Sequence, residues 1–170
     1  DRFAAQYHKS FAIKTVITRG FNHTGPRRGS EFVTSTFAKQ IAEIEAGKKE
    51  PVIQVGNLEA HRDFTDVRDM VKAYVLAVEK CEYGVAYNIC SGRMMQIQDV
   101  LDILLSYTKI KVKVEQDPQR MRPSDLTHLR GDASKFIKAT GWKMRYTIEE
   151  TLRDLLEYWR EYDKSQKVKA

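Results

Sequence analysis

Apolar residues follow two spacings along this chain of 170 residues. Short runs rich in Val, Ile and Thr are typical of buried strands, and one strictly alternating run is typical of a strand near a sheet edge. These strands are expected at residues 15–18, 52–55, 62–65, 85–90 and 111–115. Between them, apolar residues recur at helical spacing, which predicts amphipathic helices at residues 3–11, 32–46, 66–80, 97–105, 132–140 and 147–162. Because strands and helices alternate almost throughout, the sequence predicts an α/β fold with a parallel sheet.

Several side chains are expected to shape these elements. The strand at 15–18 should be covered on both faces, and Asp66 should cap the following helix 66–80 with Asp69 near its positive end. Thr147 and Glu150 form a capping box for the last helix. The buried face of helix 66–80 is expected to contain Val67, Met70, Val71, Tyr74, Val75 and Val78. Met94 and Met95 are expected to fill gaps in the core.

The composition is that of a globular protein, with 42% hydrophobic and 31% charged residues, and it excludes disordered and collagen-like chains. No apolar run approaches the roughly 18 to 20 residues that span a bilayer, and no signal segment is present, so we expect a cytoplasmic protein without a membrane partner. Cys81 and Cys90 lack the spacing of a redox or metal motif. Both are expected to be reduced and buried.

The formal net charge of +6 favours an anionic partner, either a nucleic acid or a phosphorylated small molecule. A basic nucleic-acid-binding module is therefore an alternative function. Its positive residues, however, are spread over the predicted helices and do not form a stripe studded with aromatic residues. We accordingly expect no nucleic-acid partner.

One loop is organised for phosphate. Residues 19–29, with the sequence RGFNHTGPRRG, follow a predicted strand and precede a helix, and open α/β sheets bind ligands at that edge. Glycines allow close approach of the backbone, Asn22 and Thr24 offer hydrogen bonds, and the arginines offer planar guanidinium groups. A solvated turn with incidental arginines is the alternative interpretation.

Two further loops carry arginine, at residues 61–63 and 120–125. If the three loops converge, Arg19, Arg62 and Arg122 could grip one diphosphate through charge-assisted hydrogen bonds. Asp125 could accept hydrogen bonds from ribose hydroxyls, or it could be only a local partner of Arg122. The chain shows no Ser/His/Asp pattern, no metal-ligand spacing and no phosphate-cradling loop, and its four histidines are scattered.

Three segments taken in order carry a family resemblance: RGFNHTGPRRG at 19–29, VGNLEAHRDFTDV at 55–67 and RPSD at 122–125. They resemble the C-terminal half of an extended short-chain dehydrogenase/reductase acting on sugar nucleotides. The resemblance implies the last strands of a Rossmann-like parallel sheet in residues 1–24 and a small α/β substrate-binding domain in residues 25–162. Residues 163–170 are expected to be a frayed basic tail.

Within that superfamily, NHTGPRRG followed by Phe32 and Val33 resembles GDP-mannose 4,6-dehydratase and GDP-4-keto-6-deoxy-mannose reductase. Residues 37–40 resemble the reductases slightly more. Thr36 stands where the dehydratases carry a lysine, which weakens the dehydratase assignment. Another nucleotide-sugar epimerase or dehydratase, and a noncatalytic relative with the same fold, are further alternatives.

The resemblance also implies roles for the loop residues toward a GDP-sugar. Asn22 would contact the diphosphate or the sugar, Arg62 and Arg122 would clamp the diphosphate, and Asp125 would hold the ribose. A diphosphate bound in this way would lie between all three loops.

The remaining transferred roles concern guanine and the cofactor. Val33 and Lys39 would border the guanine base. His23, Arg27 and Arg28 would lie on the side of an NADP cofactor, where the arginine pair would also connect neighbouring subunits.

The catalytic parts of this family should precede Asp1. They are a glycine-rich loop, a Ser or Thr, and a Tyr-x-x-x-Lys pair, so we expect no catalytic or metal-binding residue within residues 1–170 and no activity from these residues alone. The resemblance implies hydride transfer at sugar C4 through NADP in a homodimeric or homotetrameric parent enzyme. A dehydratase would add loss of water across C5 and C6.

Overall fold

A computed structural model describes residues 1–121 and 127–167 of the chain. The helices are α1 (Arg2–Phe11), α2 (Val33–Glu45), α3 (Val67–Lys80), α4 (Ile97–Ser106), α5 (Ser134–Thr140) and α6 (Ile148–Lys167), with a 3₁₀ turn η1 (Pro118–Arg120). The strands are β1 (Ile17–Gly20), β2 (Asn22–Thr24), β3 (Val52–Val55), β4 (His61–Asp66), β5 (Ala86–Ile89), β6 (Met94–Gln96), β7 (Lys113–Gln116) and β8 (His128–Leu129). The predicted α/β class is confirmed.

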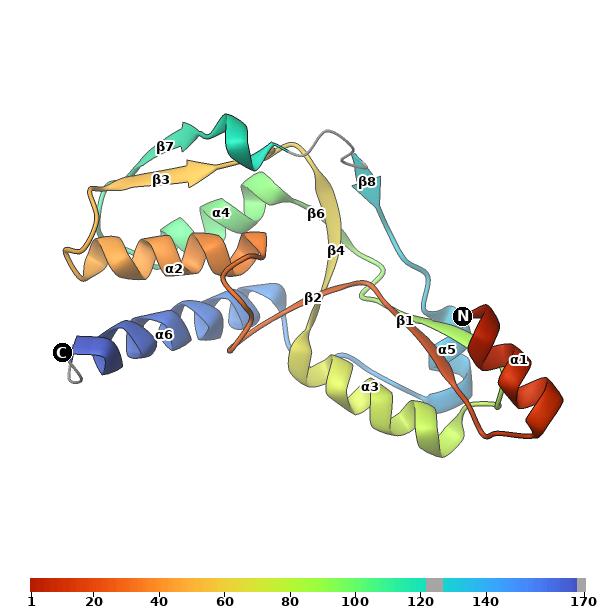
Figure 1. The fold of residues 1–170 in the computed structure, drawn as a ribbon. Helices are drawn as coiled ribbons and strands as arrows, with labels where there is room; N and C mark the ends of the chain where they lie inside the picture. The colour runs from red at the N-terminus through yellow and green to blue at the C-terminus, as the bar shows by residue number, and fades with distance from the viewer. Residues whose placement is uncertain (122–126, 168–170) are drawn as a thin grey trace.

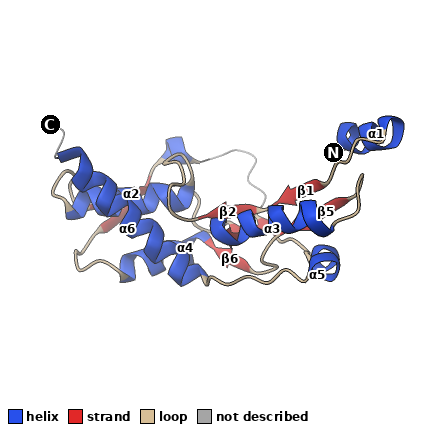
Figure 2. Cartoon of the chain, turned by 90° about the horizontal axis from the view of Figure 1, so that it is seen from below, coloured by secondary structure: helices blue, strands red, loops and turns tan. Residues whose placement is uncertain are grey.

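The strands of the described residues form three small sheets. β1 pairs with β5 and β3 pairs with β7, both in parallel, while β4 lies between a parallel β2 and an antiparallel β6 and also pairs with β8. In Figure 1, α2, α4 and α6 gather at one end of the molecule beside β3 and β7, and α1, α3 and α5 lie at the other end around β1 and β5. The view in Figure 2 shows the same division, with β2 between the two ends.

A cluster that we call the helical core fills the first end. The helical spacing of Val100, Leu101 and Leu104 on α4 and of Leu152 and Leu155 on α6 places all five side chains in it, each fully buried. The cluster consists of Phe37, Ala38, Ile41, Ala42, Ile44, Ile53, Val55, Ala60, Ile97, Val100, Leu101, Leu104, Leu152, Leu155, Leu156 and Trp159. It is enclosed by α2, α4, α6 and β3.

A second cluster, the sheet core, lies between β1, β5, α3 and α5. Its buried residues are Met70, Ala73, Ala77, Cys81, Tyr87, Ile89, Cys90, Ala133, Phe136 and Trp142. Phe136 contacts both Tyr87 and Trp142 with its ring edge-on, at centroid distances of 6.2 and 5.8 Å. The two cysteines belong to this core, and their predicted free, buried state is confirmed.

The predicted face of α3 is partly wrong. Met70 is buried as expected, together with Ala73 and Ala77, but Val71 and Val78 are 56% and 72% exposed. Small alanine side chains let a helix approach a sheet closely, so α3 packs through the face that carries its alanines. The helical spacing of apolar residues does not by itself distinguish this alanine face from the valine face.

Two other local predictions are corrected by the structure. β1 begins at Ile17, and only Ile17 of its residues is buried, so among the described residues this strand is not covered on both faces. Met94 is 42% exposed on β6, whereas Met95 packs against the helical core as predicted. Helix α6 ends at Lys167, the last residue that the structure describes.

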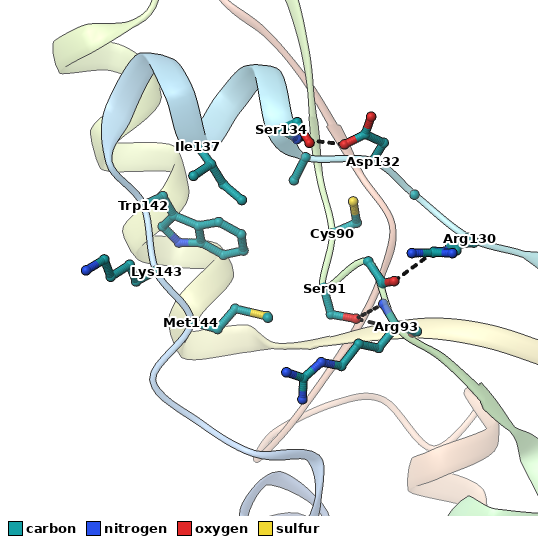
Figure 3. Close-up of a pocket in the computed structure, with 13 residues that line it drawn as sticks. Cys90, Ser91, Arg93, Arg130, Asp132, Ser134, Ile137, Trp142, Lys143 and Met144 are labelled. Atoms are coloured by element: carbon teal, nitrogen blue, oxygen red, sulfur yellow. Dashed lines mark hydrogen bonds between the residues drawn. The ribbon is translucent and has the colours of Figure 1, made fainter.

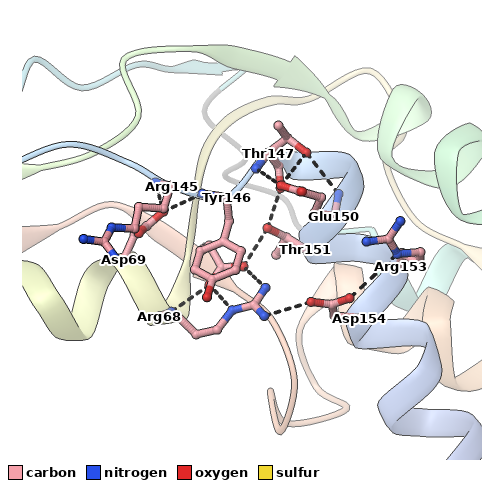
Figure 4. A network of polar contacts seen from close by, with 10 residues as sticks. Arg68, Asp69, Arg145, Tyr146, Thr147, Glu150, Thr151, Arg153 and Asp154 are labelled. Atoms are coloured by element: carbon pink, nitrogen blue, oxygen red, sulfur yellow. Dashed lines mark hydrogen bonds and ion pairs between the residues drawn. The ribbon is translucent and has the colours of Figure 1, made fainter.

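The predicted caps are confirmed and form one polar network (Figure 4). Asp66 caps α3 by accepting a 2.7 Å hydrogen bond from the Arg68 backbone N–H, and its carboxylate also accepts from the Arg68 guanidinium and from Thr151 Oγ1. The Arg68 guanidinium also forms an ion pair with Asp154 at 2.8 Å. Burial alone would raise the pKa of Asp66, but the hydrogen bonds from Arg68 and Thr151 lower it overall. The network ties α3 to α6.

Candidate functional site

A pocket of about 360 Å³ lies where the arginine loops meet α2 and β3. We call it the central pocket. It brings together three residues predicted from the sequence, namely Asn22, Val33 and Arg62. The rest of its lining is Glu31, Phe32, Thr36, Phe37, Gln54, Gly56, Asn57, Ala60, Phe64, Ile97, Gln119 and Arg120. Each of the three predicted loops therefore contributes at least one lining residue to this cavity, through Asn22, Arg62 and Arg120.

Strand pairing fixes two sides of the pocket. β2 and β4 run parallel with Asn22 opposite Phe64, and both side chains line the cavity. Since side chains alternate along a strand, Arg62 and Phe64 of β4 face the pocket while Asp63 points the other way. The fully buried Asp63 carboxylate accepts hydrogen bonds from the backbone N–H groups of Ser91, Gly92 and Gly131 and from Ser91 Oγ. Asp63 thus fixes the strand that presents Arg62.

The N-terminus of α2 forms a third side. Phe32 occupies the N-cap position without a side-chain hydrogen bond, the first turn holds no acidic residue, and Val33 and Thr36 line the pocket. Free N–H groups and the helix dipole make such an end attractive to anions.

Polar groups converge on the same space. Asn22 Nδ2 is buried and has no hydrogen-bond partner among the described residues. Arg62 donates a 2.9 Å hydrogen bond to the carbonyl of His61, and Arg120 makes an ion pair with Asp117 at 3.2 Å. Because a buried donor without a partner costs free energy, Asn22 is the group in this pocket with the clearest capacity to hold a ligand.

A close backbone contact shapes the far wall. A Cβ atom on Gly56 would lie 2.6 Å from the carbonyl oxygen of Arg120, so only glycine lets β3 and η1 approach this closely. Gly56 directly follows the predicted strand 52–55. Arg120, Phe64, Gln54 and Asn57 were also missed as lining residues, although Arg120 belongs to the third arginine loop.

The residues predicted on the cofactor side do not line the central pocket. Arg27 is exposed with a positive φ of 70°, and the Arg28 guanidinium lies 3.4 Å from the centre of the Phe32 ring. Burial lowers the pKa of Arg28, although nearby Glu31 opposes the shift, and Arg28 Nε is buried without a partner among the described residues. His23 Nδ1 is 3.1 Å from the Phe21 carbonyl.

Two other predicted residues, Lys39 and Arg19, do not line the central pocket. Lys39 lies on the α6 side of α2, with its Nζ 3.9 Å from Glu43 and 5.5 Å from the centre of the Trp159 ring. Arg19 lies at an exposed position of β1 and forms an ion pair with Asp1. Arg122 and Asp125 lie outside the described residues.

A Tyr-x-x-x-Lys spacing occurs once in the chain, at Tyr107 and Lys111, and the sequence analysis overlooked it. Tyr107 is the C-cap of α4 and Lys111 lies beyond the helix, so they do not share a helical face. The Tyr107 hydroxyl donates to the carbonyl of Glu149 at 3.1 Å. The spacing is therefore incidental to the central pocket.

Among the residues that the structure describes, no group of three or more His, Cys, Asp or Glu side chains could hold a metal ion, and none of the helices has the length and apolar character of a membrane span. Burial raises the pKa of the Cys90 thiol to about 11, which keeps it protonated and unreactive at neutral pH.

Comparison with known proteins agrees with the geometry. The family described as GDP-mannose 4,6 dehydratase matches residues 1–155. The GDP-6-deoxy-D-mannose reductase of Pseudomonas aeruginosa is 34% identical over 146 residues, covering 86% of this chain and 48% of the reductase. GDP-mannose 4,6 dehydratase 1 of Arabidopsis thaliana is 28% identical over 170 residues, covering 99% of this chain and 46% of that protein.

A solved structure shows the same fold. The structure of RMD from Pseudomonas aeruginosa complexed with NADPH superposes with a TM-score of 0.89 at 31% identity, covering 95% of this chain and 53% of that one. The chain therefore spans about half the length of the relatives that it matches. Because the family match extends over most of its residues, the chain belongs to the GDP-mannose 4,6-dehydratase family.

Proposed function

We propose that the central pocket binds the nucleoside diphosphate of a GDP-sugar. The observation that carries this proposal is that Asn22, Val33 and Arg62, from three separate segments, line one cavity in which Asn22 Nδ2 is buried without a partner among the described residues. A diphosphate supplies acceptors for Asn22 and for the Arg62 guanidinium, and the N-terminus of α2 supports negative charge nearby. Arg122 and Asp125 are proposed to complete the clamp on diphosphate and ribose.

The whole protein is proposed to be an NADP-dependent enzyme of the GDP-mannose 4,6-dehydratase kind, assembled as a homodimer or homotetramer. NADP, when bound, takes up and returns a hydride. Arg27, Arg28 and His23 are the residues of this chain proposed to lie toward it. The buried Arg28 Nε without a described partner fits an anionic group of such a cofactor. The part of this chain in the reaction is to hold and orient the sugar nucleotide.

A GDP-4-keto-6-deoxy-mannose reductase is the second candidate. Thr36 lines the pocket at the position where a lysine is expected in dehydratases, and the reductase relative is 34% identical. The two reactions are separated by supplying the whole enzyme with GDP-mannose and NADP or, in parallel, with the 4-keto sugar and NADPH. Formation of a 4-keto product supports the dehydratase, and consumption of NADPH supports the reductase.

Isothermal titration calorimetry of the whole protein tests the binding proposal. GDP should bind more tightly than UDP, and Arg62→Ala should weaken GDP binding by about 1.5–3 kcal/mol, the value of a charge-assisted hydrogen bond. Arg19→Ala is the matched control, because Arg19 is exposed and does not line the pocket. Binding of neither nucleotide, or equal losses in the two variants, would overturn the proposal.

A further inference from the structure

A hollow of about 950 Å³ lies between the loop after β5 and the segment that follows α5 (Figure 3). Two of its polar side chains are already hydrogen-bonded, and a third is turned away. Arg130 donates to the Gly92 carbonyl at 2.9 Å. Ser91 Oγ donates to the Asp63 carboxylate at 2.6 Å, and Lys143 points away from the hollow in Figure 3. This hollow therefore offers few free polar groups to a ligand, in contrast to the central pocket.

The central pocket contains an unused carboxylate, that of Glu31. Among the described residues that line the pocket, Glu31 is the only acidic one. Its carboxylate rests against the backbone of Gly29 and makes no hydrogen bond and no ion pair within residues 1–121 and 127–167. Arg28 is near enough to feel its charge, but the two groups do not pair there. The two oxygens of Glu31 are therefore available to a ligand.

The position of Glu31 is not explained by the helix that follows it. Glu31 precedes the N-cap residue Phe32 of α2, and no side-chain hydrogen bond caps this helix. A carboxylate is also unfavourable close to the diphosphate that Asn22 and Arg62 are proposed to hold, because like charges repel. A free carboxylate in an anion-binding pocket is best explained by hydrogen-bond donors on another part of the same ligand.

The wall beside Glu31 is apolar. Phe32 and Val33 follow it in the sequence and line the pocket with it. The Arg28 guanidinium lies 3.4 Å from the centre of the Phe32 ring, yet Phe32 is still 43% exposed. Aromatic and apolar surfaces suit the flat face of a nucleobase. An apolar wall bordered by a carboxylate thus fits a base that carries N–H donors along one edge.

We propose that Glu31 selects guanine in the central pocket by accepting hydrogen bonds from the N1–H and the 2-amino group of the base. This inference rests on the proposed function and adds the residue that distinguishes GDP from other nucleoside diphosphates. Guanine places two donors side by side, so a carboxylate can accept from both with its two oxygens. Uracil presents a single N–H between two carbonyl oxygens, which a carboxylate repels. The same side chain therefore favours guanine and rejects uracil.

Calorimetry of the whole protein with GDP, IDP and UDP tests this assignment. IDP differs from GDP only in lacking the 2-amino group, so the wild type should bind GDP about 10-fold more tightly than IDP through one additional charge-assisted hydrogen bond. Glu31→Ala should reduce the GDP-to-IDP affinity ratio to about 1 and the GDP-to-UDP ratio by about 10-fold or more. Ratios are compared because removal of a negative charge strengthens the binding of every diphosphate.

Glu50→Ala is the matched control. Glu50 is exposed and does not line the central pocket, so its removal should leave both ratios unchanged. Equal affinity of the wild type for GDP and IDP, an unchanged GDP-to-IDP ratio in Glu31→Ala, or a loss of affinity in Glu31→Ala for GDP-mannose but not for GDP would overturn the assignment of Glu31 alone, since the wild type would still bind GDP. Absence of GDP binding by the wild type would overturn the proposed function and this inference together.

Discussion

The helical core and the sheet core are enclosed to different degrees. On the helical side, Val100, Leu101, Leu104, Leu152, Leu155 and Leu156 are all 0% exposed. On the sheet side, apolar residues of α1 and α3 remain at the surface, including Phe3 at 84%, Phe11 at 69% and Val78 at 72% exposed, and α1 has no buried residue. Since burial of apolar surface is the main stabilising contribution, the helical side should be the more rigid of the two.

The central pocket lies on the more enclosed side of this division. Phe37, Ala60 and Ile97 belong to the helical core and also line the central pocket. Walls that are held by a packed core are pre-organised, which lowers the entropic cost of binding a small ligand.

Amide hydrogen exchange should show the largest difference between the regions. Exchange protection in α1 should be lower than in α4 by about 1,000-fold or more, because α1 opens locally while α4 opens only with the helical core. Mass spectrometry of peptides covering Arg2–Phe11 and Ile97–Ser106 measures both. Similar protection in the two helices would mean that α1 is covered in solution.

Truncation of a helical-core residue should give the next largest effect. Leu155→Ala removes a fully buried side chain, and the resulting cavity should lower the free energy of unfolding by about 2–5 kcal/mol in urea titrations. A matched substitution on the other side, Ile137→Ala, removes a 46% exposed side chain and should change stability by less than about 1 kcal/mol. Equal losses of unfolding free energy in Leu155→Ala and Ile137→Ala would contradict the difference between the two cores.

Removal of the Asp63 carboxylate should have the next largest effect on the free energy of unfolding, because Asp63 joins β4 to the loops beside the sheet core. Asp63→Ala leaves several buried N–H donors without an acceptor and should cost at least about 2 kcal/mol of unfolding free energy. Asp132→Ala is the control, since that exposed carboxylate accepts from Ser134 in a turn and should cost less than about 1 kcal/mol. If Asp132→Ala were the costlier variant in chemical denaturation, the role of Asp63 would be disproved.

The sequence alone predicts those features of the fold that depend on neighbouring residues. Asp66, Thr147 and Glu150 lie next to the N–H groups that they cap, so their roles follow from neighbouring residues alone. That Asn22 and Arg62 line one cavity was expected only on the condition that the arginine loops converge where strand ends of open sheets bind ligands.

The other features depend on contacts between segments that are far apart in the sequence, and no local pattern encodes these contacts. Asp63 lies in the predicted strand 62–65, but the sequence does not show which face of that strand is buried, and only the folded protein turns Asp63 inward to hold distant N–H groups. Lys39 was assigned to the guanine side, yet it faces α6, because that helix packs along α2. Which face of α3 is buried likewise depends on the elements that pack against it, so the exposure of its valines could not be predicted from the sequence.

Acid should weaken the connection between α3 and α6 through Asp66. Its pKa in the folded protein lies below the ordinary value of 3.8, so its contribution to stability is complete above that value and is lost as the pH falls through the lower folded-state pKa. Unfolding titrations from about pH 5 down to about pH 3 should therefore show a steeper loss for the wild type than for Asp66→Asn. Identical slopes would show that the carboxylate does not act through its charge.

The smallest effect is expected on the exposed face of α3. Val78→Ser changes a side chain that is 72% exposed, so the free energy of unfolding should stay within about 0.5 kcal/mol of the wild type in urea titrations. The adjacent Ala77 is 1% exposed against the sheet core, and Ala77→Val should cost about 1–3 kcal/mol by overpacking. If Val78→Ser proved as costly as Ala77→Val, α3 would be covered in solution, and the two cores would be equally enclosed.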